Sequence, residues 1–156
     1  MARERTQPAG CHAHAINSAG VSICLETFTF RDSDIGRRFR DALTVAARRG
    51  VCARLVVDAV GSFGLARDYF TELVAAGGAM RWFNELRLAS FSFRDHRKLL
   101  VVDDIVFIGS SNLAPRSLRI NFEIILRIQD ATLAATARQQ NVLFYRTPSH
   151  VIAASP

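Results

Sequence analysis

The sequence predicts an α/β protein with a single domain, in which a central mixed β-sheet is flanked by helices. Residues 21–76 alternate a strand pattern with a helix pattern twice, which favours parallel strands joined by helices that pack on the sheet. Residues 99–108 contain two apolar runs separated by only two acidic residues, a pattern typical of an antiparallel hairpin. The 156 residues suffice for one domain with a real core but not for two of ordinary size.

The first part of the chain holds the alternating units. Residues 21–30 (VSICLETFTF) place β-branched and aromatic side chains at near-alternate positions, which predicts a strand. Asp32 or Ser33 offers the N-cap of a helix that ends at Gly50. The apolar face of this helix is formed by Ile35, Phe39, Leu43 and Ala46. A second unit follows, with a strand at 53–58, a glycine-bearing turn at 61–64, a helix at 65–76 and a short strand at 80–83.

The second part of the chain favours strands. Phe91 and Phe93 alternate, and the apolar runs 99–102 and 105–108 predict a hairpin that turns at Asp103-Asp104. Residues 121–128 (NFEIILRI) predict one more strand, and Asp130 offers the cap of a closing helix that extends to about residue 144. The folded domain is therefore expected over 13–146, between a flexible lead-in at 1–12 and a loose tail at 147–156.

The composition restricts the cellular setting and the partners. No apolar run approaches the length of about 20 residues that spans a bilayer, and the N-terminus lacks the apolar core of a signal peptide. Three cysteines without CxxC spacing argue against a disulfide framework. We therefore expect a cytoplasmic protein. Its formal net charge of +6 favours an anionic partner, which is nucleic acid, an acidic membrane surface or a phosphorylated substrate.

Lys98 is the only lysine, since the other nineteen of the twenty basic residues are arginine. A GC-rich genome replaces lysine codons with arginine codons, so the single exception points to a position that requires a compact ammonium group. Two residues earlier lies His96, in the segment HRKLLVVD with the form H-x-K-x4-D ending at Asp103. On a strand, side chains two positions apart leave the same face and converge on one anion.

These residue types suit a phosphodiester. An imidazole attacks phosphorus or protonates a leaving oxygen near neutral pH, and an ammonium group neutralises the non-bridging oxygens. The next strand ends in the segment GSSN at 109–112, which offers hydroxyls and an amide to a phosphate. Glu123 lies within the apolar run 122–128, where an unpaired carboxylate is costly, so it is expected to pair with a histidine or to face solvent at an edge.

The combined motif resembles the phospholipase D superfamily, whose signature (the HKD motif) is HxKxxxxD followed by GSxN. Residues 25–43, 56–62, 82–84, 94–103 and 116–123 are similar to bacterial cardiolipin synthases. The resemblance implies that His96 is the nucleophile or the general acid, that Glu123 orients it, and that Asp103 supports the site. It also implies that Lys98, Ser110 and Asn112 bind the substrate phosphate, with no metal or organic cofactor. His12 and His14 are expected to be surface histidines rather than metal ligands, because nothing nearby completes a site.

The sequence departs from the family pattern in three ways. Five residues rather than six separate Asp103 from Gly109, Ala114 stands where cardiolipin synthases commonly carry aspartate, and the chain holds one copy of the motif rather than two. Since one histidine attacks while another protonates the leaving group, a homodimer that shares one active site is expected.

The leading functional hypothesis is a phosphatidyltransferase or phospholipase that acts on an anionic glycerophospholipid, with peripheral contact at the inner face of the membrane. Nucleic acid is the alternative substrate, in a single-motif, metal-independent nuclease. A third hypothesis is an inactive half-domain of a two-motif enzyme.

Overall fold

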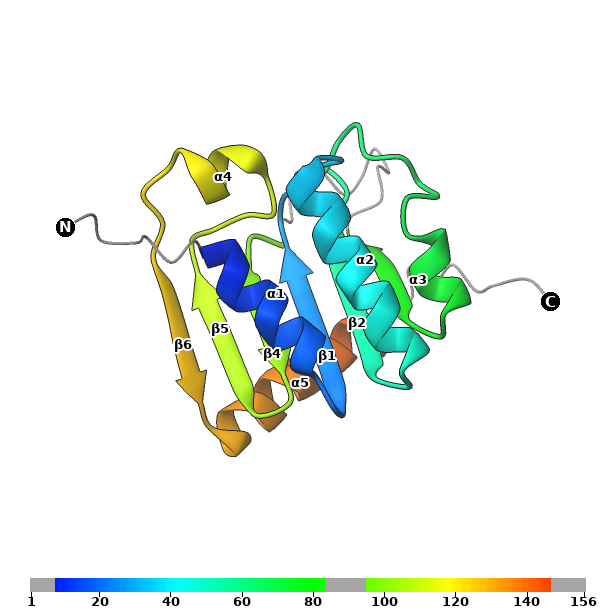
Figure 1. The fold of residues 1–156 in the computed structure, drawn as a ribbon, viewed down its shortest axis with the longest axis vertical. Helices are drawn as coiled ribbons and strands as arrows, with labels where there is room; N and C mark the ends of the chain where they lie inside the picture. Colours follow the sequence, from blue (N-terminus) through cyan, green and yellow to red (C-terminus); the bar gives the residue numbers. More distant parts are fainter. Residues whose placement is uncertain (1–7, 84–94, 147–156) are drawn as a thin grey trace.

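The computed structural model describes residues 8–83 and 95–146. Six strands form one sheet in the order β3-β2-β1-β4-β5-β6 (Figure 1). The strands are β1 (Ser22–Thr27), β2 (Cys52–Asp58), β3 (Ala79–Phe83), β4 (Lys98–Val102), β5 (Ile105–Gly109) and β6 (Ile125–Gln129). The helices are α1 (Pro8–Ser18), α2 (Asp34–Arg48), α3 (Thr71–Ala75), α4 (Pro115–Arg119) and α5 (Ala131–Arg146). This confirms the predicted mixed α/β architecture.

The sheet changes direction at its central strand. β1 pairs in parallel with β2, and β2 with β3, whereas β1–β4, β4–β5 and β5–β6 are antiparallel. The parallel half follows from the helical crossovers, and the antiparallel half from connections too short for a crossover. Thr27 lies opposite Lys98 in the β1–β4 register, so the end of β1 meets the start of β4.

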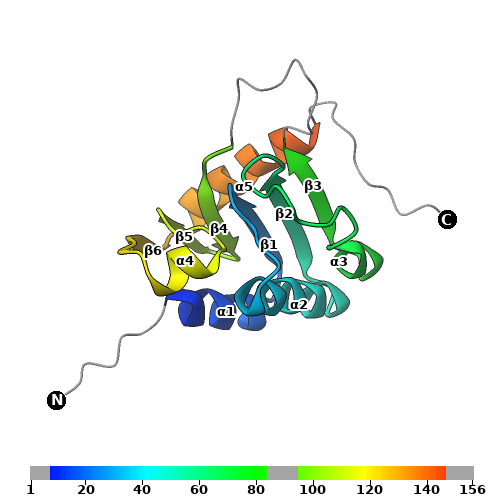
Figure 2. The same cartoon turned by 90° about the horizontal axis from the view of Figure 1, so that it is seen from above.

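Helices cover both faces of the sheet (Figure 2). α1 and α2 lie on one face, where they contact each other, and α5 lies on the opposite face against β1, β4 and β5. The larger core lies under α1 and α2 and includes the fully buried side chains of Ile23, Leu43 and Leu55. Each such side chain contributes roughly 1.5–3 kcal/mol relative to exposure, so this face anchors the fold.

Several local predictions are confirmed. Ser33 caps α2, since its hydroxyl accepts a hydrogen bond from Gly36 N at 3.1 Å. Asp130 precedes α5 and accepts from Leu133 N at 2.8 Å. The hairpin turns at Asp103-Asp104, with Val102 opposite Ile105. Asp103 adopts φ +48°, the left-handed backbone that a two-residue hairpin turn requires and that aspartate tolerates.

Other elements differ from the expectation. Helix α1 begins at Pro8, inside the stretch 1–12 expected as a lead-in, because its buried face packs on α2 and the sheet. The helix expected over 65–76 is confined to α3, preceded by turns. The strand expected over 121–128 begins only at Ile125, because the short helix α4 and the residues after it occupy the preceding positions. Phe91, Phe93 and the tail 147–156 lie outside the described residues.

His12 is buried, so the expectation of a surface histidine is wrong for this residue, whereas His14 is exposed. The His12 ring packs edge-on against Phe107, with the ring centroids 4.8 Å apart, and against Phe39. Burial lowers the pKa of His12 to about 4, so the side chain is neutral at physiological pH and serves as part of the core. No helix in the described ranges is long and apolar enough to cross a membrane.

Candidate active site

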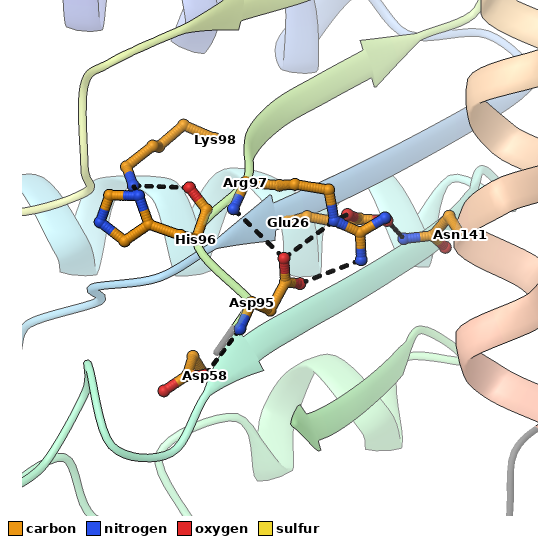
Figure 3. Close-up of polar contacts among 7 residues, drawn as sticks. All are labelled: Glu26, Asp58, Asp95, His96, Arg97, Lys98 and Asn141. Atoms are coloured by element: carbon orange, nitrogen blue, oxygen red, sulfur yellow. Dashed lines mark hydrogen bonds and ion pairs between the residues drawn. The ribbon is translucent and has the colours of Figure 1, made fainter. Parts of the chain in front are cut away.

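The motif residues lie where β1 ends and β4 begins. His96 precedes β4, and Lys98 is its first residue (Figure 3). The Lys98 Nζ atom lies 2.9 Å from His96 Nδ1 and donates a hydrogen bond of 2.6 Å to the His96 carbonyl oxygen. An ammonium group only donates, so Nδ1 is the acceptor and the ring proton resides on Nε2 in this arrangement. The two side chains therefore converge as the H-x-K spacing predicts.

The aromatic ring of Phe28 supports both side chains. Its centroid lies 4.8 Å from that of the His96 ring and 5.5 Å from Lys98 Nζ. Partial burial lowers the pKa of Lys98, while the negative charges of Asp95 and Glu123 oppose this shift. Lys98 thus combines a positive charge with incomplete hydration, which strengthens its attraction for an anion.

Ser110 and Glu123 form a second polar group beside these residues. The Ser110 hydroxyl donates a short hydrogen bond to Glu123 Oε2 and accepts one from Ile124 N at 3.2 Å. Asn121 Nδ2 donates to Glu123 Oε1 at 3.3 Å. Glu123 precedes β6 and is half-buried, so the expectation that it lies inside an apolar strand is wrong. Among the described residues, no hydrogen bond or ion pair joins Glu123 to His96.

Asn112 has its side-chain oxygen occupied. Its Oδ1 atom accepts a hydrogen bond from Thr29 N at 3.2 Å, which ties the GSSN segment to the end of β1. The isolated bridge between Phe30 and Leu113 reinforces the same contact. The side-chain amide nitrogen of Asn112 has no hydrogen bond to a described residue and is able to donate to a phosphate oxygen.

Asp103 lies at the opposite end of β4. Five strand residues at about 3.3 Å each put it roughly 16 Å from the start of that strand. Its carboxylate accepts hydrogen bonds from the backbone N–H groups of Gly20, Val21 and Ser22 at 2.9, 2.9 and 2.8 Å. Burial opposes the charge, but these three hydrogen bonds outweigh it and lower the pKa of Asp103. The structure therefore does not bring Asp103 to His96.

A small pocket, partly open to solvent, adjoins the motif residues. Its polar lining consists of His12, Glu26, Thr27, Lys98 and Ser111. The rest is mainly apolar and includes Leu25, Phe39, Leu100, Phe107, Leu113 and Ile125. The described residues contain no group of three or more His, Cys, Asp or Glu side chains that is able to hold a metal ion.

Residues 13–141 match the protein family described as "Cardiolipin synthase, PLD-like domain". The chain belongs to this family.

The curated relatives of this PLD-like domain include cardiolipin synthases. The chain is 36% identical over 104 residues to a cardiolipin synthase of Alkalihalophilus pseudofirmus and 39% identical over 105 residues to cardiolipin synthase B of Escherichia coli K12. These matches cover 64% and 63% of this chain but only 21% and 25% of the relatives. The chain thus matches about a quarter or less of the length of either relative.

Among solved structures, a phospholipase D family member, Nuc from Salmonella typhimurium, superposes with a TM-score of 0.72. The similarity covers 92% of this chain and 90% of that one, at 24% identity. A phosphatidylserine synthase from Haemophilus influenzae superposes with a TM-score of 0.62 over 90% of this chain and 36% of that one, at 16% identity. These similarities show that the fold is that of the phospholipase D superfamily.

The PLD-like domain also contains polar residues near His96 that do not occupy defining positions of the motif. Asp95, Arg97, Glu26, Asp58 and Asn141 are linked to one another on the sheet face covered by α5 (Figure 3). One signal was present in the sequence, since Glu26 interrupts an otherwise apolar strand pattern. Its partners Arg97 and Asn141 come from two other parts of the chain, and sequence patterns do not reveal such pairings.

Proposed function

We propose that this domain catalyses phosphodiester transfer through a phosphohistidine at His96, as a cardiolipin synthase-like phosphatidyltransferase acting on an anionic glycerophospholipid. The observation that carries the proposal is the 2.9 Å contact between Lys98 Nζ and His96 Nδ1. It occurs in a chain that is 36% identical over its matched region to a cardiolipin synthase. An imidazole and an ammonium group next to one another provide a nucleophile and a phosphate-binding charge.

The reaction has two steps. The His96 Nε2 atom attacks phosphorus while the P–O bond to the leaving alcohol breaks, and a general acid protonates the departing oxygen. In the second step an acceptor hydroxyl attacks phosphorus and loses its proton to the same group, the P–N bond breaks, and His96 is regenerated. Attack requires the lone pair on Nε2 and the proton on Nδ1. Lys98 therefore has to leave Nδ1 for a phosphate oxygen when substrate binds, with Ser110 and Asn112 as further donors.

Glu123 becomes free to orient the histidine in the same rearrangement. Its carboxylate is held by the Ser110 hydroxyl and by Asn121 without substrate. If Ser110 turns to the phosphate, Glu123 Oε2 loses this donor and becomes available to accept a hydrogen bond from Nδ1–H of a nearby imidazole.

The surroundings of Lys98 support a lipid rather than a purely polar substrate. The pocket there is lined mostly by Leu, Phe and Ile side chains. Most of these belong to the buried core, so the pocket suits the glycerol carbons next to the phosphate rather than an acyl chain. The net charge of +6 suits an anionic headgroup and peripheral contact with the inner face of the membrane.

The general acid is assigned to a second copy of His96 in a homodimer. An exposed apolar patch supports this assembly, and it consists of Ile108, Ile120, Phe122, Ile124 and Leu126, with side chains exposed by 42% to 100%. Glu123 lies between two patch residues, and Ser110 follows shortly after another. A second copy that covers the patch therefore lies next to the site, and desolvating five apolar side chains favours such an interface.

The dimer is tested with Leu126→Glu, which places a charge in the patch, and with Val45→Glu as control, at an exposed apolar position on α2. Analytical ultracentrifugation should show a dimer for the wild type and the control and a monomer for Leu126→Glu. When equal amounts of wild-type and His96→Ala chains exchange freely, about a quarter of the dimers remain fully wild type. A wild-type monomer with full activity would exclude the shared site.

The activity is tested with the purified chain on phosphatidylglycerol vesicles, with glycerol or water as acceptor, and on plasmid DNA. We expect lipid turnover and a phosphohistidine that is absent in His96→Asn. The nuclease alternative rests on the superposition with Nuc over 90% of that chain. DNA cleavage without lipid turnover would establish this alternative. No turnover of either substrate by a folded dimer would establish an inactive half-domain.

A further inference from the structure

A buried polar network contains the two residues that precede and follow His96 in the sequence. It consists of Glu26, Asp58, Asp95, Arg97 and Asn141, and we refer to it as the Glu26 network (Figure 3). Glu26, Asp58 and Asn141 are fully buried, and Asp95 is buried except for 3% of its surface. Buried ionised groups cost free energy unless they are paired, and burial raises the pKa of Glu26, while the hydrogen bond from Asn141 and the charge of Arg97 oppose this shift.

The residue before His96 is anchored to β2. Asp95 N donates a hydrogen bond of 3.0 Å to Asp58 Oδ2. Asp58 Oδ1 in turn accepts from Val60 N at 2.9 Å and Gly61 N at 2.8 Å, which fixes the orientation of this carboxylate. The backbone on the N-terminal side of His96 is thus held to the end of β2.

The residue after His96 is anchored to β1 and α5. Arg97 N and Nε donate to Asp95 Oδ1 at 3.2 and 2.8 Å, and Nε also lies 3.0 Å from Glu26 Oε2. Asn141 Nδ2 from α5 donates to Glu26 Oε1 at 2.7 Å. Figure 3 shows the Arg97 side chain directed toward Glu26 and Asn141, whereas His96 and Lys98 point toward one another.

His96 itself has weak local support. The β1–β4 register ends at the pair Thr27–Lys98, so His96 lies beyond the last strand pair. Its imidazole is exposed and contacts Phe28 and Lys98. Small displacements of a nucleophile cost large factors in rate, because attack requires a defined distance and direction.

We propose that the Glu26 network holds the backbone on both sides of His96, and that Arg97 and Glu26 are positioning residues for the reaction. This inference rests on the proposed function. The Arg97 guanidinium group links the Asp95 carboxylate to the Glu26 carboxylate on β1. Asn141 links Glu26 to α5. Glu26 also lines the pocket beside Lys98, and glutamine preserves the size of this part of the lining, so we expect Glu26→Gln to change substrate affinity little.

The test uses Glu26→Gln, which keeps the size of the side chain and an acceptor for Asn141 but removes one of the two carboxylates paired with Arg97, the other being Asp95. The matched control is Glu72→Gln, the same chemical change in an exposed ion pair with Arg48. We expect kcat to fall about tenfold in Glu26→Gln with KM unchanged within about twofold, and both parameters to stay at wild-type values in Glu72→Gln. The triple variant Glu26→Gln/Asp95→Asn/Arg97→Met removes the three paired charges together, so none of them is left buried without a partner. It should fold and show the same loss even if the single variant unfolds.

A second readout is independent of turnover. The chain contains four histidines, so the ¹³Cε1–H signal of His96 is assigned by its loss in His96→Asn. We expect a rigid ring in the wild type and increased ring motion in the folded network variants. If the wild type is inactive but the ring motion of His96 increases in the network variants, the proposed function is rejected and the positioning role is retained. Wild-type kcat and unchanged ring motion in a folded network variant would overturn the inference.

Discussion

Asp103→Asn separates the structural from the catalytic contribution of the motif aspartate. The substitution preserves the shape of the side chain and the tolerance for φ +48°, but removes the charge that three backbone N–H groups share. A hydrogen bond to a buried charged group contributes about 1.5–3 kcal/mol, and partial exposure reduces this to roughly 1 kcal/mol each. In asparagine the bond from Gly20 is lost and the two bonds to Oδ1 from Val21 and Ser22 lose the charge that strengthens them, so we expect a loss of about 2 kcal/mol in the free energy of unfolding.

Such a loss corresponds to a decrease in Tm of roughly 4–8 °C for a chain of this size. Urea denaturation and calorimetry measure it, with Asp104→Asn as control. Asp104 is exposed in the same turn, and its substitution should change the free energy of unfolding by less than about 0.5 kcal/mol. Activity per folded molecule should remain near wild type in both variants, because Asp103 lies at the far end of β4 from His96.

The pH dependence gives a further check. The pKa of Asp103 is lower in the folded protein than in the unfolded chain, where it is about 3.9. Its stabilising contribution is therefore complete above about pH 4 and is lost as the pH falls through the folded-state pKa. The stability difference between wild type and Asp103→Asn should shrink over this acidic range. Loss of activity in Asp103→Asn with unchanged stability would refute the reasoning and place Asp103 in the reaction.

Three further predictions concern the site. His96→Asn should lower the rate of turnover by at least about a thousandfold and prevent phosphohistidine formation. Tm should change by less than about 2 °C, since the exposed ring contributes little packing. Lys98→Arg should lower kcat/KM by about a hundredfold, because the planar guanidinium does not fit the space beside Nδ1, and near-normal rates would contradict the need for an ammonium group. Gly61→Ala should destabilise the protein by about 2 kcal/mol, measured by urea denaturation, because the added Cβ would lie 2.1 Å from the carbonyl oxygen of Phe28.

Local signals explain the parts of the fold that the sequence predicted correctly. The Ser33 cap, the Asp130 cap and the Asp103-Asp104 turn each depend on neighbouring residues, and all three are present in the structure. Helix α1 was missed because its sequence, PAGCHAHAINS, is rich in small residues and lacks a clear apolar stripe. Its position depends on packing against α2, which no local pattern encodes.

The candidate site was predictable only in part, for the same reason. His96 and Lys98 are two residues apart, so their contact is local: Lys98 Nζ turns back to the His96 ring and carbonyl oxygen. Glu26 and Asn141 are separated by 115 residues, and their contact exists only because α5 folds back onto β1. Asp103 was expected near His96 because both belong to one motif, yet β4 lies between them.

The apolar patch has a consequence for handling the protein. β6 ends the strand order of the described sheet, so one of its sides presents backbone N–H and C=O groups without a strand partner. Exposed strand edges with apolar side chains join to other chains nonspecifically, and Ile124 and Leu126 provide such side chains here. A chain that remains monomeric therefore carries an aggregation-prone edge. Aggregation through this edge is expected to increase with the concentration of monomer, and a charged residue at Leu126 should suppress it.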